Sequence, residues 1–387
     1  MQQERIRHLA KLLAAGGRAR DAQAEAMMDG GVAAAAAPAR QTLDVVEQAL
    51  SAPPDGVDAA KWRAAREQLL THARNGLVKL QRGDLQLAAD EGCAMEAVII
   101  SDGTRPSFLL CDGEIDPKDP FIGPWDGNIA TAQALGIARL AAAVGRIQPQ
   151  HGHASRYVGT GTLIDRDAGL ILTNYHVIEQ AQHNYGVAMT RDGDRLRVDG
   201  WLEIDFVGEA CSLRSQRFRI VEVALPQGYG STFAGIDAAV ARIEPLPDSP
   251  ALPDPAPLLS AEPAYATGAI SSLALIGFPA QPALQDGKDV DWNFVLRVLF
   301  GNRFGVKRLA PGHFTLPLGS HALDQGRRAI GHDATTFGGA SGALVMSWLD
   351  DRTPSFALHF GGTTGASNYA LSFAASHQAL RAIGARF

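Results

Sequence analysis

The apolar pattern changes along the chain from a helical repeat to short strand-like runs. Near the start, Ile6, Leu9, Leu12 and Leu13 recur at the spacing of one helical face. Alanine is frequent in this part and β-branched residues are few, which is the composition that helices prefer. The pattern therefore predicts a helical N-terminal region over residues 1–93.

A mixed stretch follows over residues 94–143. The pair Asp102-Gly103 lies between two apolar runs within residues 96–113, which is typical of a β-hairpin. A proline-rich segment occupies residues 117–125, and the apolar residues of 128–143 have helical spacing. We therefore predict a hairpin and a connecting helix between the N-terminal region and the rest of the chain.

From residue 144 to residue 387 the pattern is that of an all-β domain. Its apolar runs are short and are separated by turn residues. A proline-laden connector over residues 245–258 interrupts them, because proline cannot donate to a central ladder. Residues 377–383 are typical of a closing helix. The predicted strands cover residues 144–147, 159–164, 169–173, 218–223, 238–243, 273–277, 304–307, 343–346, 356–360 and 369–373.

Composition and charge narrow the class of protein. Hydrophobic residues make up 46% of the chain and charged residues 20%, as in globular proteins. The formal net charge of −6 gives no basic footprint, so we predict that nucleic acid is not a partner. Lys11 breaks the first apolar run, and no run is long enough to be a secretory signal or to span a membrane. We therefore expect a cytoplasmic protein that is not bound to a membrane.

Cysteine is rare in this chain. The three cysteines, Cys93, Cys111 and Cys211, form an odd and sparse set, which predicts no disulfide framework. We therefore expect an apolar core alone to stabilise the fold, and a chain of 387 residues is long enough to bury one.

Three short segments carry the residue types that nucleophilic catalysis needs. A serine hydroxyl is a poor nucleophile at neutral pH, and it needs a base to take its proton and an acid to orient that base. Each motif alone is compatible with an ordinary strand end or turn, although a carboxylate among apolar residues requires a partner. The order His, Asp, Ser is that of the chymotrypsin class. The segments are Ile171-Leu-Thr-Asn-Tyr-His176-Val, Gly235-Ile-Asp237-Ala-Ala-Val and Thr336-Phe-Gly-Gly-Ala-Ser341-Gly.

Taken together, the motifs resemble those of the bacterial trypsin-like serine peptidases. The resemblance covers residues 144–387 and implies a mainly β fold, a chymotrypsin-like double β-barrel, preceded here by the helical N-terminal region. It implies that His176 is the general base, that Asp237 supports it and that Ser341 is the nucleophile. It also implies an oxyanion hole formed by the backbone N–H groups of Gly339 and Ser341. The motifs are Gly159-Thr-Gly-Thr-Leu-Ile, Leu172-Thr-Asn-Tyr-His-Val and Gly338-Gly-Ala-Ser-Gly.

The same resemblance suggests a substrate preference. Thr336 and His359 are similar to a threonine and a histidine that bind an acidic P1 side chain in the glutamyl endopeptidases. Thr335 stands where the floor of the S1 pocket is expected, and its lack of charge disfavours a basic P1 residue. Gly361 is a further candidate for substrate binding. The alternative is that His359 is a structural residue at a strand end, so acidic preference is a hypothesis.

Other candidates point to no additional chemistry. His151 and His153 have no cysteine or carboxylate at ligand spacing, so we predict no metal and no cofactor. The expected partner is a protein or peptide substrate. The N-terminal region either binds a regulatory partner or caps the barrels. The alternative function is that of an inactive protease fold that serves as a binding or scaffold protein.

Overall fold

The computed structural model describes the following residues. They are 105–117, 119, 122, 125–149, 157–260, 272–280, 303–321, 323–336, 338–347, 355–363 and 367–387, with a few positions between 59 and 75. Apart from those few positions, the predicted helical region over 1–93 lies outside these ranges. The predicted turn at Asp102-Gly103 and the histidines His151 and His153 lie outside them as well, so these predictions stay untested.

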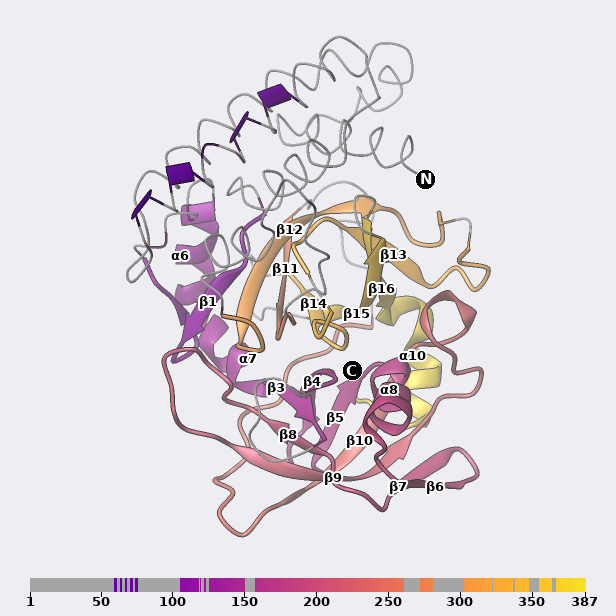
Figure 1. Cartoon of the computed structure of the whole chain (residues 1–387). Coiled ribbons are helices and arrows are strands. Elements are labelled where there is room, and N and C mark those ends of the chain that lie inside the picture. Colours follow the sequence, from indigo (N-terminus) through magenta and orange to yellow (C-terminus); the bar gives the residue numbers. More distant parts are fainter. Residues whose placement is uncertain are drawn as a thin grey trace.

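Two antiparallel sheets each close into a six-stranded barrel (Figure 1). The first barrel has the strand order β10-β5-β4-β3-β8-β9, and pairing of β10 with β9 closes it. Its strands are β3 (Val144–Gln148), β4 (Gly159–Asp165), β5 (Leu170–Thr173), β8 (Glu203–Asp205), β9 (Arg217–Ala224) and β10 (Ala239–Pro245), and β7 (Arg195–Val198) and β6 (Met189–Asp192) extend the sheet beyond β9.

The second barrel has the order β11-β14-β15-β16-β13-β12, and pairing of β11 with β12 closes it. The double-barrel prediction is therefore confirmed. Two further strands, β1 (Phe108–Cys111) and β2 (Glu114–Ile115), extend this sheet beside β12. The barrel strands are β11 (Ser272–Gly277), β12 (Arg308–Leu316), β13 (Ala329–His332), β14 (Leu344–Met346), β15 (Ser355–Thr363) and β16 (Ser367–Ser372).

Close packing around glycine shows why β4 is buried along its whole length. A Cβ atom on Gly161 would lie 3.1–3.3 Å from the side chains of Ile147, Ile171 and Ile204, which come from three other strands of the first barrel. The small residue therefore leaves room for three branched side chains at the barrel centre. Burial of each such side chain contributes about 1.5–3 kcal/mol to stability.

Helices join and flank the barrels. The single helix predicted over residues 128–143 is wrong, because Gly136 has a φ of 86° and separates two helices. Glycine adopts this left-handed conformation without steric cost, and there the chain changes direction. The helices are α6 (Asp126–Ala134), α7 (Ile137–Ala143), α8 (Tyr175–Tyr185) and α10 (Phe373–Ala382), together with the short 3-10 helix η2 (Thr232–Ala234).

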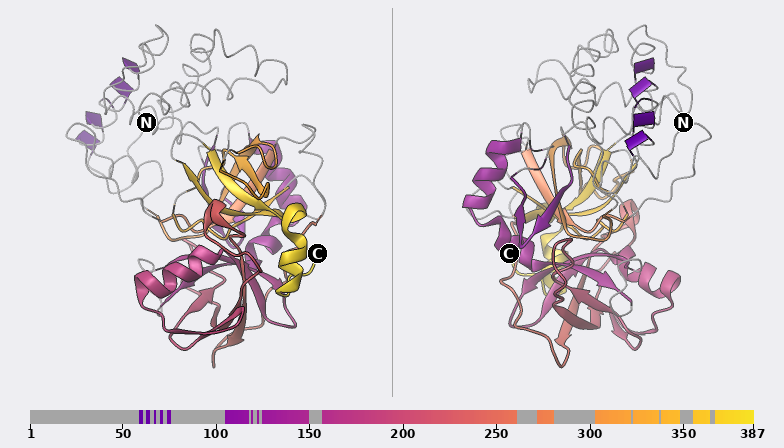
Figure 2. Two further views of the ribbon diagram at one scale, coloured as in Figure 1. Left: turned by 90° about the vertical axis from the view of Figure 1, so that its right-hand side faces the viewer. Right: turned by 60° about the vertical axis from the view of Figure 1, so that its left-hand side comes forward.

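The chain returns to the first barrel at its C-terminal end. Helix α10, yellow in Figure 2, packs on β15 and β16 of the second barrel. Beyond it, Arg386 forms an ion pair of 2.9 Å with Asp165 at the end of β4. The two barrels are thus joined by this C-terminal segment as well as by the connector after β10.

Some predicted strands differ from the observed ones. The strand predicted over residues 304–307 is wrong, since β12 begins at Arg308. Strands β6, β7, β8 and β13 were not predicted, because they are short or alternate polar with apolar residues weakly. No helix in the described part of the chain combines the length and the apolar character needed to cross a bilayer.

Residues 105–115, here called the N-terminal strap, are tied to the first barrel by a disulfide. Cys111 is bonded to Cys211 across a sequence separation of 100 residues, with Cα atoms 5.6 Å apart. The expectation of no disulfide is therefore wrong. A count of cysteines could not reveal this pair, because its two members meet only after β1 docks beside the loop that follows β8.

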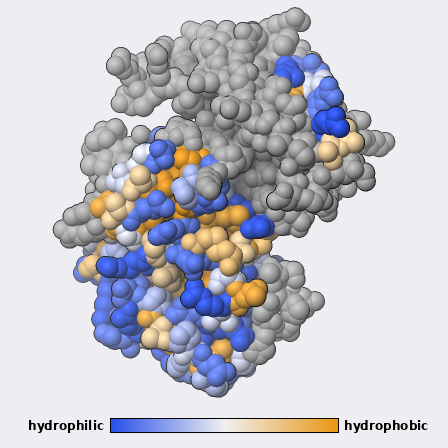
Figure 3. All heavy atoms as spheres, turned by 90° about the vertical axis from the view of Figure 1, so that its left-hand side faces the viewer, coloured by the Kyte–Doolittle hydropathy of each residue, from blue (hydrophilic) through white to orange (hydrophobic). Residues whose placement is uncertain are grey.

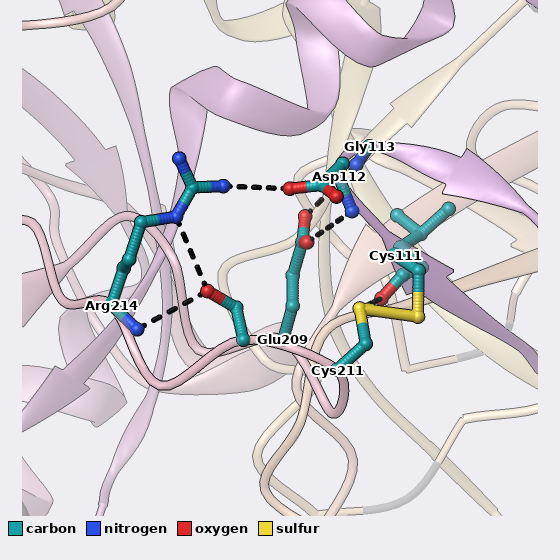
Figure 4. Close-up of a disulfide and its surroundings, with 8 residues drawn as sticks. Cys111, Asp112, Gly113, Glu209, Cys211 and Arg214 are labelled. Carbon is teal, nitrogen blue, oxygen red and sulfur yellow. Dashed lines mark hydrogen bonds and ion pairs between the residues drawn. A yellow bond between two sulfur atoms is a disulfide. The ribbon is translucent and has the colours of Figure 1, made fainter.

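Polar contacts strengthen the same attachment (Figure 4). The carboxylate of Glu209 accepts hydrogen bonds from the backbone N–H groups of Asp112 and Gly113, at 2.5 and 3.1 Å. Arg214 forms an ion pair of 2.6 Å with the Asp112 carboxylate. The observed hairpin between β1 and β2 therefore turns at Asp112-Gly113, where the first barrel holds it.

Candidate active site

His176 and Asp237 lie side by side at the edge of the first barrel. His176 is in the first turn of α8, directly after β5, and Asp237 precedes β10. The Nδ1 atom of His176 is 2.7 Å from Oδ2 of Asp237. Asn174 donates from Nδ2 to the backbone carbonyl of Asp237 at 2.7 Å, which ties the two segments together.

The Asp237 carboxylate is fully buried and accepts several hydrogen bonds. Besides the imidazole, the backbone N–H of His176 donates to Oδ1 at 3.1 Å and that of Thr232 donates to Oδ2 at 2.7 Å. Buried carboxylates require such partners. With Nδ1–H of His176 donating to Asp237, the Nε2 atom is left as the proton acceptor.

The loop between β13 and β14 carries Ser341 and is held against β4. Thr160 donates from its backbone N–H to the carbonyl of Ser341 at 2.8 Å and from Oγ1 to the carbonyl of Gly339 at 2.8 Å. A Cβ atom on Gly159 would lie 3.0 Å from the Ser341 carbonyl oxygen and 2.6 Å from the side chain of Val177. Residue 159 thus lies between the Ser341 loop and the residue that follows His176.

Two glycines give this loop its shape. Gly339 and Gly342 both have a φ of 90°, in the left-handed region that favours glycine. A Cβ atom on Gly339 would lie 2.5 Å from the carbonyl oxygen of Phe278, and one on Gly342 would lie 1.9 Å from that of Thr160. Larger residues are therefore excluded by both conformation and space at these two positions.

Several polar groups of the loop form no hydrogen bond within the described part of the chain. The backbone N–H groups of Gly339 and Ser341 donate to no acceptor there, and the Ser341 hydroxyl forms no hydrogen bond with His176. In substrate-free enzymes, catalytic hydrogen bonds are often long and tighten when substrate binds. The loop thus has two backbone donors and one hydroxyl that a ligand could engage.

Comparison with known proteins identifies the family. A model of the trypsin-like peptidase domain matches residues 159–352, which include His176, Asp237 and Ser341. The chain is also similar to a probable serine protease of Lysobacter enzymogenes, with 88% identity over 387 residues that cover 100% of both chains. The chain belongs to the trypsin-like serine peptidases. This peptidase carries β1, β2, α6 and α7 outside the matched range.

Thr335, the predicted floor of the S1 pocket, binds the N-terminal strap. Its Oγ1 donates to the backbone carbonyl of Arg105 at 2.6 Å. The side chain of Arg105 forms an ion pair of 2.5 Å with Asp333 in the same segment. Sequence reasoning did not identify Arg105, since it lies more than two hundred residues away from Thr335 along the chain.

The other predicted substrate-binding residues lie on either side of the Ser341 loop. Thr336 is half-buried, and His359 and Gly361 are on β15. The backbone of His359 brackets the loop, because its N–H donates to Ala343 and its carbonyl accepts from Gly342, both at 2.9 Å. Strand β15 thereby holds the two residues that follow Ser341.

The His359 ring contacts a second buried histidine, on β13. His332 Nε2 is 3.1 Å from His359 Nδ1, and both residues are almost completely buried. Burial lowers the pKa of His332 to about 3. Burial, together with the charges of His332 and His176, holds the pKa of His359 well below its usual value, although a hydrogen bond to the Tyr369 backbone acts the other way. Both rings are therefore neutral at neutral pH.

Metal ligands do not cluster in the described part of this peptidase, where no group of three or more His, Cys, Asp or Glu side chains could hold an ion. The chemistry that these residues can perform is instead that of a hydroxyl, an imidazole and a buried carboxylate.

Proposed function

We propose that this peptidase cleaves peptide bonds within proteins through a triad of His176, Asp237 and Ser341. The observation that carries the proposal is the 2.7 Å contact between His176 and the buried Asp237 carboxylate, beside a loop that carries a serine. In such an arrangement the aspartate keeps the imidazole in the tautomer that can accept a proton from the serine.

The mechanism follows from these groups. Ser341 Oγ attacks the carbonyl carbon of the substrate while His176 Nε2 takes the hydroxyl proton. The backbone N–H groups of Gly339 and Ser341 stabilise the oxyanion, and loss of one such donor typically costs about 3–4 kcal/mol. His176 then gives its proton to the leaving amine, and an acyl-enzyme remains. Water, deprotonated by His176, hydrolyses the ester and restores Ser341.

The direct test is labelling of the full chain with a fluorophosphonate probe. We expect labelling of the wild-type protein that is lost in Ser341→Ala and strongly reduced in His176→Ala. His183→Ala is the matched control, because His183 is an exposed residue on the same helix α8. Labelling that persists in Ser341→Ala would contradict the proposal.

A second candidate is a binding or scaffold protein on an inactive protease fold. It is favoured by one observation, namely that the Ser341 hydroxyl forms no hydrogen bond with His176 in this structure. Absence of both probe labelling and peptide hydrolysis in the wild-type protein, across a range of pH, would support this candidate over the enzyme.

We also propose a preference for glutamate at P1. Thr336 and His359 flank the expected pocket, and a proton on His332 Nε2 would place the proton of the His359 ring on Nε2, a donor that a carboxylate could accept from. Because the His359 ring is neutral, this donor alone separates Glu from Gln only modestly. Peptides that differ only in Glu, Gln or Lys at P1 test the idea, and equal hydrolysis of the Glu and Gln peptides would refute it.

Two wider proposals concern the setting of the reaction. We predicted a cytoplasmic location, but the Cys111–Cys211 disulfide favours an oxidising compartment, where such bonds persist. Alkylation of free thiols in freshly lysed cells distinguishes the two settings, since only the reduced protein would be modified at both cysteines.

For the region 1–93 we propose binding of a regulatory partner. Comparison of hydrolysis by the full chain and by a chain that begins at residue 94 tests whether this region changes activity.

A further inference from the structure

The first residues of the N-terminal strap lie along the outside of the second barrel. Strand β1 pairs antiparallel with β12, with Phe108 opposite Leu309. The guanidinium group of Arg308 donates to the carbonyl of Ser107, which fixes the chain just before β1. These residues precede the range that matches the family model.

Arg105 contacts the segment that leads to the nucleophile in two ways. Its backbone carbonyl accepts the hydroxyl proton of Thr335 at 2.6 Å. Its guanidinium group pairs with Asp333 at 2.5 Å, where the two side chains are only 14% and 7% exposed. The guanidinium carbon also lies 6.0 Å from the ring centre of Trp125. Arg105 is therefore held by contacts with Thr335, Asp333 and Trp125.

Asp333 is fixed from its other side by β12. Its Oδ1 accepts from the backbone N–H of His313 at 2.6 Å, and its own N–H donates to the His313 carbonyl at 3.1 Å. The carboxylate thus cannot turn outward to water without breaking these bonds. Removal of the Arg105 cation would leave a largely buried negative charge two residues before Thr335, and a charge of that kind is strongly unfavourable unless a new cation reaches it.

We propose that Arg105 is a positioning residue for P1 recognition, which holds Thr335 in place and neutralises Asp333 behind the floor of the S1 pocket. The inference rests on the proposed function, because it takes Thr335 as the pocket floor. In this inference, the N-terminal strap determines the net charge of the pocket, because its Arg105 neutralises Asp333 next to Thr335. With Arg105 present, the floor offers no net negative charge to a lysine or arginine at P1.

The experiment compares full-length wild-type protein with Arg105→Gln on peptides that differ only at P1. In the variant we expect the kcat/KM ratio for Lys over Gln at P1 to rise about tenfold, since an opposite charge would now be favoured in the pocket. For the Gln peptide, KM should rise by a larger factor than kcat falls. For a peptide with Ala at P1, kcat/KM should stay within about twofold of the wild-type value, because the alanine side chain does not reach the floor of the S1 pocket.

Two further variants separate charge from folding. Asp333→Asn should shift the profile in the opposite direction, toward Glu, and the double variant Arg105→Gln/Asp333→Asn should return the Lys-to-Gln ratio to that of the wild type. Arg139→Gln is the matched control, since Arg139 is 80% exposed and its contact with Asp254 is a long 3.8 Å.

The outcomes are distinguishable. An unchanged P1 profile in Arg105→Gln and Asp333→Asn would overturn the inference and leave the proposed function standing. An equal loss for all peptides, including that with P1 Ala, would also overturn it, because it would show a structural role alone. Lack of Ser341-dependent hydrolysis in the wild-type protein would overturn the proposed function and this inference with it.

Discussion

The two barrels differ in how they bury polar side chains. In the first barrel, the buried Glu203 is surrounded by donors, with Gln148 at 2.6 Å, Trp201 at 2.9 Å and Arg217 at 3.6 Å. The second barrel instead buries a pair of histidines, His332 and His359, whose lowered pKa keeps them neutral. On the face shown in Figure 3, apolar residues are more frequent at the surface over the second barrel than over the first.

This difference suggests a division of tasks between the barrels. The first barrel carries the buried Asp237 carboxylate and the imidazole that pairs with it. The second barrel buries two neutral histidines, and Thr160 and Arg105, which come from outside it, contact the Ser341 loop and Asp333. The following predictions test this comparison.

The largest effect should come from replacement of the buried Asp237 carboxylate in the first barrel. We expect Asp237→Asn to lower kcat about 10⁴-fold with little change in KM, because the amide no longer selects the tautomer that leaves His176 Nε2 free. Steady-state kinetics on a peptide substrate measure this. Asp199→Asn, at a largely exposed position of the same barrel, is the control, and a loss below about tenfold in Asp237→Asn would refute the assigned role.

A smaller effect should follow loss of the bond between the strap and the first barrel. We expect Cys211→Ser to lower the free energy of unfolding by about 2–4 kcal/mol, because the Cys111–Cys211 bond closes a long loop in the unfolded chain. Urea denaturation without reductant measures the change. The wild-type protein in reductant should show the same loss, and an unchanged midpoint in both cases would argue against a stabilising bond.

The neutral histidines of the second barrel should make stability fall in acid. The folded pKa of His332 is about 3 and that of the unfolded chain is near the usual 6.5, so between these values only the unfolded state binds the proton. Stability should therefore decrease by up to about 1.4 kcal/mol per pH unit for this residue as the pH falls below 6.5. Denaturation at several pH values should show a shallower slope in His332→Gln. In the exposed control His183→Gln the slope should be unchanged, and equal slopes for all three proteins would contradict the prediction.

The smallest effect should come from loss of the Thr160 hydroxyl, which joins β4 of the first barrel to the Ser341 loop. Thr160→Val removes the hydrogen bond to the Gly339 carbonyl and keeps the backbone bond to Ser341, so we expect kcat to fall about threefold to tenfold. Thr160→Ser keeps the hydroxyl and should retain most of the activity. Equal kcat values in Thr160→Val and the wild type would show that the backbone bond alone holds the loop.

The architecture was largely predictable from local pattern and family resemblance. The runs that became β3, β4, β5, β9, β10, β11, β14, β15 and β16 are strongly apolar, and the barrels that they form follow from the resemblance. The pairing of His176 with Asp237 was also expected from the motifs that surround them. Their geometry agrees with that expectation, whereas the catalytic roles themselves await the kinetics described above.

What could not be predicted depends on contacts between distant segments. Arg105 meets Thr335 only because β1 adds to the edge of the second barrel, and Cys111 meets Cys211 for the same reason. Gly136 separates two helices although the apolar spacing is continuous across it, because glycine readily adopts the left-handed conformation at which a helix ends. The neutrality of His359 likewise arises from complete burial, which no local motif encodes.

The disulfide also constrains how this protein can be processed. A backbone cut anywhere between Asp112 and Ala210 would leave two pieces that remain covalently joined through Cys111 and Cys211. Release of the preceding residues by a protease would therefore require a cut upstream of Cys111, or reduction after the cut. A cut directly before Arg105 would remove residues 1–104 and leave the strap in contact with Thr335.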